Sequence, residues 1–252
     1  MLVESEILYR PSTSSETIIG VLDDFFELAS KKTWLREPTA KAICTLIISL
    51  PRFPNPISVS KYVQQKLNDS GLLHSQDGAA ILLTFHTLPK ELRPHTDKIW
   101  HHADPLHASN LSLLTKVLKA SSSDDDTVKH TGNFKGEAHF VWMFILRRYM
   151  EKATDIIPFE KLWKAVVESP PPNLRSDLTV GGFFSSSSSL ERKYRGFQLF
   201  KLFLPQLPAE LVKCLFTDSF IRSLINHSSS GDRYLNKAAK KTVSTTSRDS
   251  SC

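Results

Sequence analysis

Apolar residues recur along most of the chain at the spacing of one face of a helix. The first clear stripe consists of Ile18, Leu22, Phe25 and Ala29. These positions follow one another at i, i+4, i+7 and i+11, which is the period of an amphipathic α-helix. Thr13 and Glu16 precede the stripe at the spacing of a capping box. The pattern predicts a helix that begins near residue 13 and ends near the basic residues at 31–32.

The same kind of segment returns at short intervals. Residues 34–51 place Pro38 in a first turn and end an apolar run at Pro51, so they predict a second helix that pairs with the first as a hairpin. Strand-like alternation is absent, and the apolar segments add up to about eleven helices. We therefore predict an all-α fold. Further helical segments begin near residues 58, 76, 110, 137, 159, 190, 208, 218 and 232.

The spacing of the most apolar segments favours a repeat architecture. They begin near residues 38, 76, 137 and 190, roughly 40 to 60 residues apart, and the lower end of this range is typical of helix-pair repeats. We predict a HEAT/armadillo-like helical solenoid, with an irregular helical bundle as the alternative. The expected organisation is a disordered N-terminus at 1–12, a helical-repeat domain at 13–243 and a disordered tail at 244–252.

Charge separates the end of the chain from the rest. The formal net charge is +6, and the whole excess falls on residues 186–252 because acidic and basic residues are equal in number before that point. A cationic surface attracts phosphate or acidic protein, although such residues can also form a merely solvated face. On a helix at residues 232–243, about 100° per residue brings four cations onto one stripe opposite apolar residues. These cations are Arg233, Lys237, Lys240 and Lys241.

A second basic group lies in the segment "SSSSSLERKYRGFQLFKLFLPQLP" at residues 185–208. Its serines form an expected loop, and its helix is amphipathic at the start and apolar on all sides towards the end. Arg192, Lys193 and Arg195 are therefore expected at an exposed helix end, as further candidates for nucleic-acid or acidic-partner contact. Trp34, Trp142 and Trp163 lie among apolar helical residues, and we expect all three in the core.

Two polar clusters could bind metal, but each has a simpler explanation. The segment "HTDKIWHHADPLH" gathers His95, His101, His102 and His107 with Asp97 and Asp104. Its spacings match no helical histidine pair and no cysteine is near, so a polar joint between helices is favoured over zinc. Asp124–Asp126 stand between serines and polar residues and read as a solvated loop. Phosphate-binding, dinucleotide and nucleophile-elbow motifs are missing, so we predict no catalytic residue, cofactor, metal or small-molecule substrate.

The remaining composition favours an intracellular protein. Cys44, Cys214 and Cys252 are far apart and lack CxxC spacing, which indicates reduced thiols. The apolar runs are too short for a membrane span, and the first residues show no secretory signal. A protein that associates with no membrane is expected.

Three blocks resemble one known family. "LASKKTWLREPTAKAI", "SSSLERKYRGFQLFKLFL" and "FTDSFIRSLINHSSSGDRYLNKAAKK" are similar, in this order, to segments of the fungal DNA polymerase V (DNA polymerase phi) and Myb-binding protein 1A family. The resemblance extends over roughly residues 17–243. It implies a HEAT/armadillo-like solenoid in the nucleus and nucleolus, with a role in rRNA gene transcription and ribosome biogenesis.

The resemblance also suggests three alternative functions. Family members are much longer, so we expect a fragment or a truncated gene model. The main hypothesis is a non-catalytic scaffold whose partners are rDNA or nucleolar transcription and ribosome-assembly proteins. The family's name offers DNA polymerase activity as a rival, but strand-borne metal-binding carboxylates of the D-T-D kind are missing. A pure protein-interaction module is the third possibility.

Overall fold

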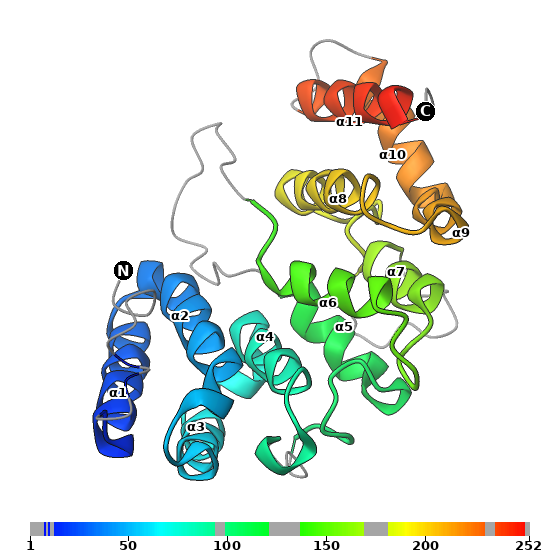
Figure 1. Cartoon of the computed structure of the whole chain (residues 1–252). Helices are drawn as coiled ribbons and strands as arrows, with labels where there is room; N and C mark the ends of the chain where they lie inside the picture. Colours follow the sequence, from blue (N-terminus) through cyan, green and yellow to red (C-terminus); the bar gives the residue numbers. More distant parts are fainter. Residues whose placement is uncertain are drawn as a thin grey trace. The chain divides into compact units, whose positions relative to one another are not determined.

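The computed structural model describes residues 8, 10, 13–93, 99–120, 137–168, 181–229 and 235–249, with side chains described as far as residue 244. Every regular element within these residues is helical and no strand occurs among them, which confirms the predicted all-α fold (Figure 1). The chain divides into two compact units. The first comprises residues 1–117 and 139–145, and the second comprises residues 118–138 and 146–252.

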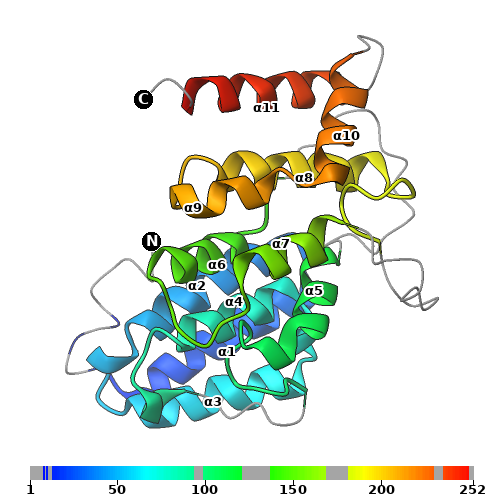
Figure 2. The same cartoon turned by 90° about the vertical axis from the view of Figure 1, so that its right-hand side faces the viewer.

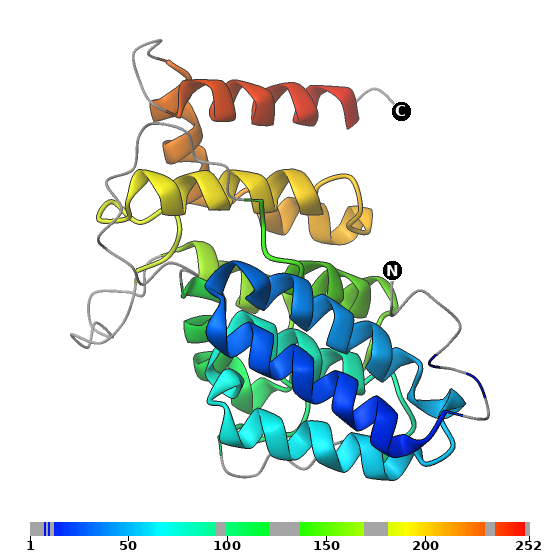
Figure 3. The same ribbon diagram turned by 90° about the vertical axis from the view of Figure 1, so that its left-hand side faces the viewer.

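The first unit is built around the hairpin of α1 and α2, against which α3 and α4 pack. α1 packs against α2 and α3, and α2 packs against α4 (Figures 1 and 3). These contacts bury apolar residues of all four helices. The helices of this unit are α1 Ser15–Lys31, η2 Thr33–Leu35, α2 Arg36–Ile48, η3 Leu50–Arg52, α3 Pro56–Asp69, η4 Leu72–His74, α4 Gln76–Phe85, η5 Lys90–Leu92, η6 Ala108–Asn110 and most of α5 Leu111–Lys119.

Local sequence determines where α1 and α4 begin. The side chain of Ser14 accepts a hydrogen bond from the backbone N–H of Thr17, so Ser14 caps α1 in place of the predicted Thr13. Ser75 caps α4 in the same way by accepting from the N–H of Gly78 at 3.1 Å. Gly78 must be glycine, because a Cβ there would lie 2.0 Å from the carbonyl oxygen of Leu72.

α1 and α4 differ in how much of their surface is buried. α1 buries a single stripe of four residues, one of which is Phe26 in place of the predicted Phe25. α4 is buried from Gly78 through Phe85, as expected of a helix covered on all sides. The buried residues of α1 are Ile18, Leu22, Phe26 and Ala29.

The histidine-rich segment is a hydrogen-bonded turn as far as the structure describes it. The amide nitrogen of the Asn110 side chain donates to the carbonyl oxygens of His102 at 2.8 Å and Asp104 at 2.7 Å. The His102 and His107 rings stack with their centroids 4.0 Å apart. Among the described residues no group of three or more potential ligands could hold a metal ion. His95, Asp97 and the acidic run at 124–126 lie outside those residues.

The second unit is built around aromatic side chains. Phe200 on α8 stacks on Phe220 of α10 with ring centroids 4.2 Å apart, and Phe203 lies 5.6 Å from the Trp163 ring. The Trp163 indole N–H donates to the carbonyl of Leu215 at 3.3 Å, so this buried polar group is satisfied. α5 and α6 Val141–Met150 each contribute residues to both units. The other helices are α7 Phe159–Val167, α8 Leu190–Phe203, α9 Ala209–Val212, η8 Lys213–Leu215, α10 Asp218–Ser228 and α11 Asn236–Asp249.

The helix lengths fit the predicted alternative of an irregular bundle better than a uniform repeat. They range from 4 residues in α9 to 17 residues in α1. α11 continues to Asp249, whereas the sequence predicts a disordered tail from residue 244. No described helix combines the length and the apolar character that crossing a bilayer requires.

The expected burial of the tryptophans is confirmed for two of the three. Trp142 and Trp163 are buried, but Trp34 is 72% exposed, so its predicted core position is wrong. Trp34 lies in the short joint η2, outside the regular helices whose periodicity suggested burial.

Candidate nucleic-acid interface

The positive charge of residues 186–252 gathers on two neighbouring helices of the second unit. α11 packs against both α8 and α10 (Figure 2). The Asn236 side chain fixes the start of α11, because its amide donates to the carbonyl oxygens of His227 at 3.0 Å and Ser228 at 3.2 Å at the end of α10. The position of α11 is thus set by buried polar contacts as well as by apolar packing.

The predicted basic stripe of α11 faces solvent over its described part. Leu235, Ala239 and Thr242 are buried on one side of the helix. Lys237, Lys240 and Lys241 are exposed, and at about 100° per residue they occupy the opposite side. Arg233, the fourth predicted member, lies outside the described residues.

α8 adds a cation that the sequence does not connect with the stripe. Lys201 is partly buried, and burial, reinforced by the nearby charge of Lys241, lowers its pKa. The two ammonium groups therefore lie close enough to repel each other. A phosphate bound near both would relieve that repulsion. We call Lys201, Lys237, Lys240 and Lys241 the α8–α11 lysine face.

The other three predicted cations are less available than expected. Arg192, Lys193 and Arg195 are partly buried. A guanidinium nitrogen of Arg195 bonds to a carboxylate oxygen of Glu191 at 2.6 Å. Arg192 donates from Nη2 to the carbonyl of Gly181 at 2.7 Å, and its guanidinium carbon lies 5.8 Å from the centroid of the Phe183 ring. Arg192 thus connects α8 to residues 181–183, and Arg195 is paired within its own helix.

A buried lysine that the sequence did not single out lies beside this group. Lys119 ends α5, and burial, with a smaller effect from Arg192, lowers its pKa from 10.5 to about 8. The pKa of Arg192 is itself lowered, first by burial and then by the charge of Arg195. Sequence periodicity could not reveal this arrangement, because Lys119 and Arg192 belong to different helices.

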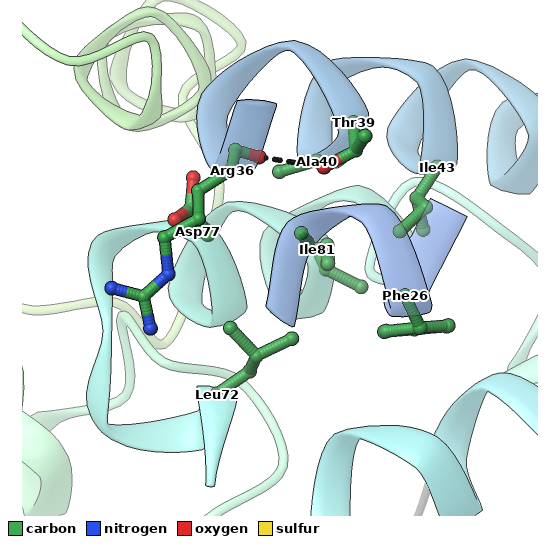
Figure 4. A pocket seen from close by; sticks show the side chains of 9 residues that line it. Phe26, Arg36, Thr39, Ala40, Ile43, Leu72, Asp77 and Ile81 are labelled. Atoms are coloured by element: carbon green, nitrogen blue, oxygen red, sulfur yellow. Dashed lines mark hydrogen bonds between the residues drawn. The ribbon is translucent and has the colours of Figure 1, made fainter. Parts of the chain in front are cut away.

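The first unit contains a small pocket with little catalytic character. Figure 4 shows the Arg36 side chain at its edge, away from the apolar side chains of Phe26 and Ile43. Asp77, the only carboxylate that lines it, is hydrogen-bonded to Nε2 of His139 at 3.0 Å. Burial raises the pKa of the Cys44 thiol to about 12, so this cysteine is a packing group at neutral pH.

The described helices and their packing define the class of this molecule: an all-α protein with the character of an irregular helical bundle. Within that class the chain belongs to the DNA polymerase phi family, whose model matches residues 1–248. This confirms the resemblance drawn from the three sequence blocks.

Two fungal proteins show the same relationship. The chain is 30% identical over 246 residues to the rDNA transcriptional regulator pol5 of Schizosaccharomyces pombe, which covers 96% of this chain and 24% of the relative. It is 26% identical over 261 residues to the rDNA transcriptional regulator POL5 of Saccharomyces cerevisiae, which covers 91% of this chain and 24% of the relative. The chain therefore spans about a quarter of the length of either protein. No solved structure matches it.

Proposed function

We propose that this chain acts in the regulation of rDNA transcription, as a non-catalytic helical scaffold that binds the DNA backbone through the α8–α11 lysine face. The names of the two fungal relatives support the process. The observation that supports DNA contact is the exposure of Lys237, Lys240 and Lys241 on one side of α11, with Lys201 of α8 close enough to Lys241 to feel its charge. Since rDNA is transcribed in the nucleolus, the proposed location is the nucleolus, with a further role in ribosome biogenesis.

The geometry fits backbone contact better than base reading. Lysine ammonium groups neutralise phosphates as point charges and carry little sequence information. Lys237 and Lys240 form no ion pair with any described residue, so both are available to a polyanion. Sequence-independent binding of this kind suits a scaffold that remains on rDNA chromatin while other proteins supply specificity.

Fluorescence anisotropy with a labelled rDNA duplex tests the proposal. The triple variant Lys237→Ala, Lys240→Ala, Lys241→Ala is expected to bind at least tenfold more weakly than the unaltered chain, because three phosphate contacts are lost. The matched control replaces Lys152, Lys161 and Lys213, which are exposed cations of the same unit, and changes the net charge equally. Equal loss in both variants would show that only overall charge matters.

Two other hypotheses, DNA polymerase activity and a pure protein-interaction module, predict different results. Primer extension with Mg²⁺ that is abolished by replacing Asp124–Asp126 with Ala would establish polymerase activity and contradict the scaffold proposal. Unchanged duplex affinity in the triple variant would instead favour a pure protein-interaction module.

A further inference from the structure

One exposed aromatic side chain in the first unit is not explained by the fold. Trp34 is 72% exposed, whereas the other three tryptophans of the chain, Trp100, Trp142 and Trp163, are at most 3% exposed. Large aromatic side chains are normally buried, because leaving them in water forgoes about 1.5–3 kcal/mol of transfer free energy. Among the large apolar side chains of the described residues Trp34 is the most exposed, and an exposed indole offers a face on which a ligand can stack.

The joint that carries Trp34 is well defined. Its backbone is tied to α1 at one end, where the Lys32 N–H donates to the carbonyl of Leu28 at 3.0 Å. The next turn is closed by the N–H of Leu35, which donates to the carbonyl of Lys32 at 2.9 Å. The indole is therefore presented from a hydrogen-bonded turn between two helices, and binding requires little ordering of the backbone.

Positively charged residues flank Trp34 in the sequence. Lys31, Lys32 and Arg36 are all exposed, and Lys32 and Arg36 each lie two residues from Trp34, so their Cα atoms are within about 7.6 Å of its own. Lys31 is paired with Glu27. Lys32 and Arg36 form no ion pair within 4.0 Å among the described residues, and the carboxylate that shares a pocket with Arg36 is that of Asp77, which is hydrogen-bonded to His139.

The combination selects one kind of partner. Protein hot spots built on tryptophan are usually ringed by contacts that exclude water. Here Trp34 is instead the only large apolar side chain exposed within residues 32–36, and its flanks are charged. An aromatic face beside cations matches single-stranded nucleic acid, in which unstacked bases alternate with phosphates about one nucleotide apart. The bases of a duplex are already stacked on one another, so they cannot stack on the indole ring.

We propose that Trp34, Lys32 and Arg36 form a binding site for single-stranded nucleic acid, with one base stacked on the indole and flanking phosphates held by the two cations. The site is separate from the α8–α11 lysine face and goes beyond the proposed duplex contact. It requires no base-specific readout, so oligo(U) and oligo(dT) are both expected to bind.

Tryptophan fluorescence measures binding at Trp34 directly. Because the other three indoles are buried, quenching on addition of oligo(U) or oligo(dT) reports on Trp34. Trp34→Ala is expected to weaken binding of a labelled oligonucleotide between about fivefold and about a hundredfold, whereas Trp34→Phe, which keeps an aromatic face, retains most of the affinity. Lys32→Ala with Arg36→Ala is expected to reduce the salt slope by about 1.4.

The matched control is Ile48→Ala, another exposed apolar residue of the same unit, which should leave affinity unchanged. Circular dichroism verifies that each variant is folded. Unchanged oligonucleotide affinity in Trp34→Ala would overturn the proposal. So would quenching by an acidic, aromatic peptide with none by either oligonucleotide. Because the lysine-face variants are tested with duplex DNA, failure here is distinguishable from failure of the proposed function.

Discussion

Gly196 lies in the middle of α8. Its replacement by alanine should change stability in the opposite direction to the one that helix propensity predicts. On helix propensity alone, Gly196→Ala should stabilise the protein by about 1 kcal/mol. In the structure, a Cβ at this position would lie 2.5 Å from Cζ of Phe184 and 2.9 Å from both of its Cε atoms. The ring has little room to move, since it is buried with its centroid 5.2 Å from Phe197 and 5.3 Å from Phe220.

The expected balance is destabilising. Overpacking a core typically costs about 1–3 kcal/mol, and after the propensity gain of about 1 kcal/mol a net loss of up to about 2 kcal/mol remains. Urea denaturation followed by circular dichroism measures the change. Gly20→Ala in α1 is the matched control, because a Cβ there meets nothing within 4 Å, and it should stabilise by about 0.5–1 kcal/mol.

A second substitution isolates the cause. Leucine at position 184 lacks the Cε and Cζ atoms that obstruct the new methyl group. In a Phe184→Leu background, Gly196→Ala should therefore cost nothing or stabilise, and the double-mutant cycle should show a coupling of about 1–2 kcal/mol. If Gly196→Ala alone stabilises as much as Gly20→Ala, the close approach of helix and ring is refuted.

Two further predictions follow from the buried ionisable groups. Because the pKa of Lys119 is lowered from 10.5 to about 8, the unfolded chain binds this proton more tightly, so the free energy of unfolding should rise as the pH increases from about 8 to about 10.5. Lys119→Met should remove that rise in urea titrations, and an unchanged pH dependence would contradict the burial. In a Cys252→Ser chain at neutral pH, a thiol reagent should modify the partly exposed Cys214 quickly and the buried Cys44 only on unfolding; equal rates would contradict the assignment.

Helix periodicity is enough to predict the fold class and most of the buried stripe of α1. The stripe on α1 was right at Ile18, Leu22 and Ala29, and wrong at Phe25 because the chain buries Phe26 instead. Both positions fit a helical face within one residue, and only packing against the neighbouring helices decides between them.

Sequence periodicity does not predict features that depend on tertiary contacts or on the joints between helices. The orientation of the α11 lysines follows from spacing alone, but the approach of Lys201 to Lys241 depends on how α8 packs against α11. Trp34 was misassigned because the apolar residues around it belong to two helices, and the joint between them leaves the indole in solvent. Arg192 and Arg195 looked exposed on a helical wheel, which cannot show partners such as the carbonyl of Gly181.

The central claim is that the α8–α11 lysine face binds phosphates, and the salt dependence of duplex binding tests it most directly. Each neutralised phosphate contributes about 0.9 to the slope of log K against log salt concentration. Replacing Lys237, Lys240 and Lys241 with Ala should therefore reduce the magnitude of the slope by about 2–3, while the control variant at Lys152, Lys161 and Lys213 keeps it. An unchanged slope in the lysine-face variant would show that these residues do not contact DNA.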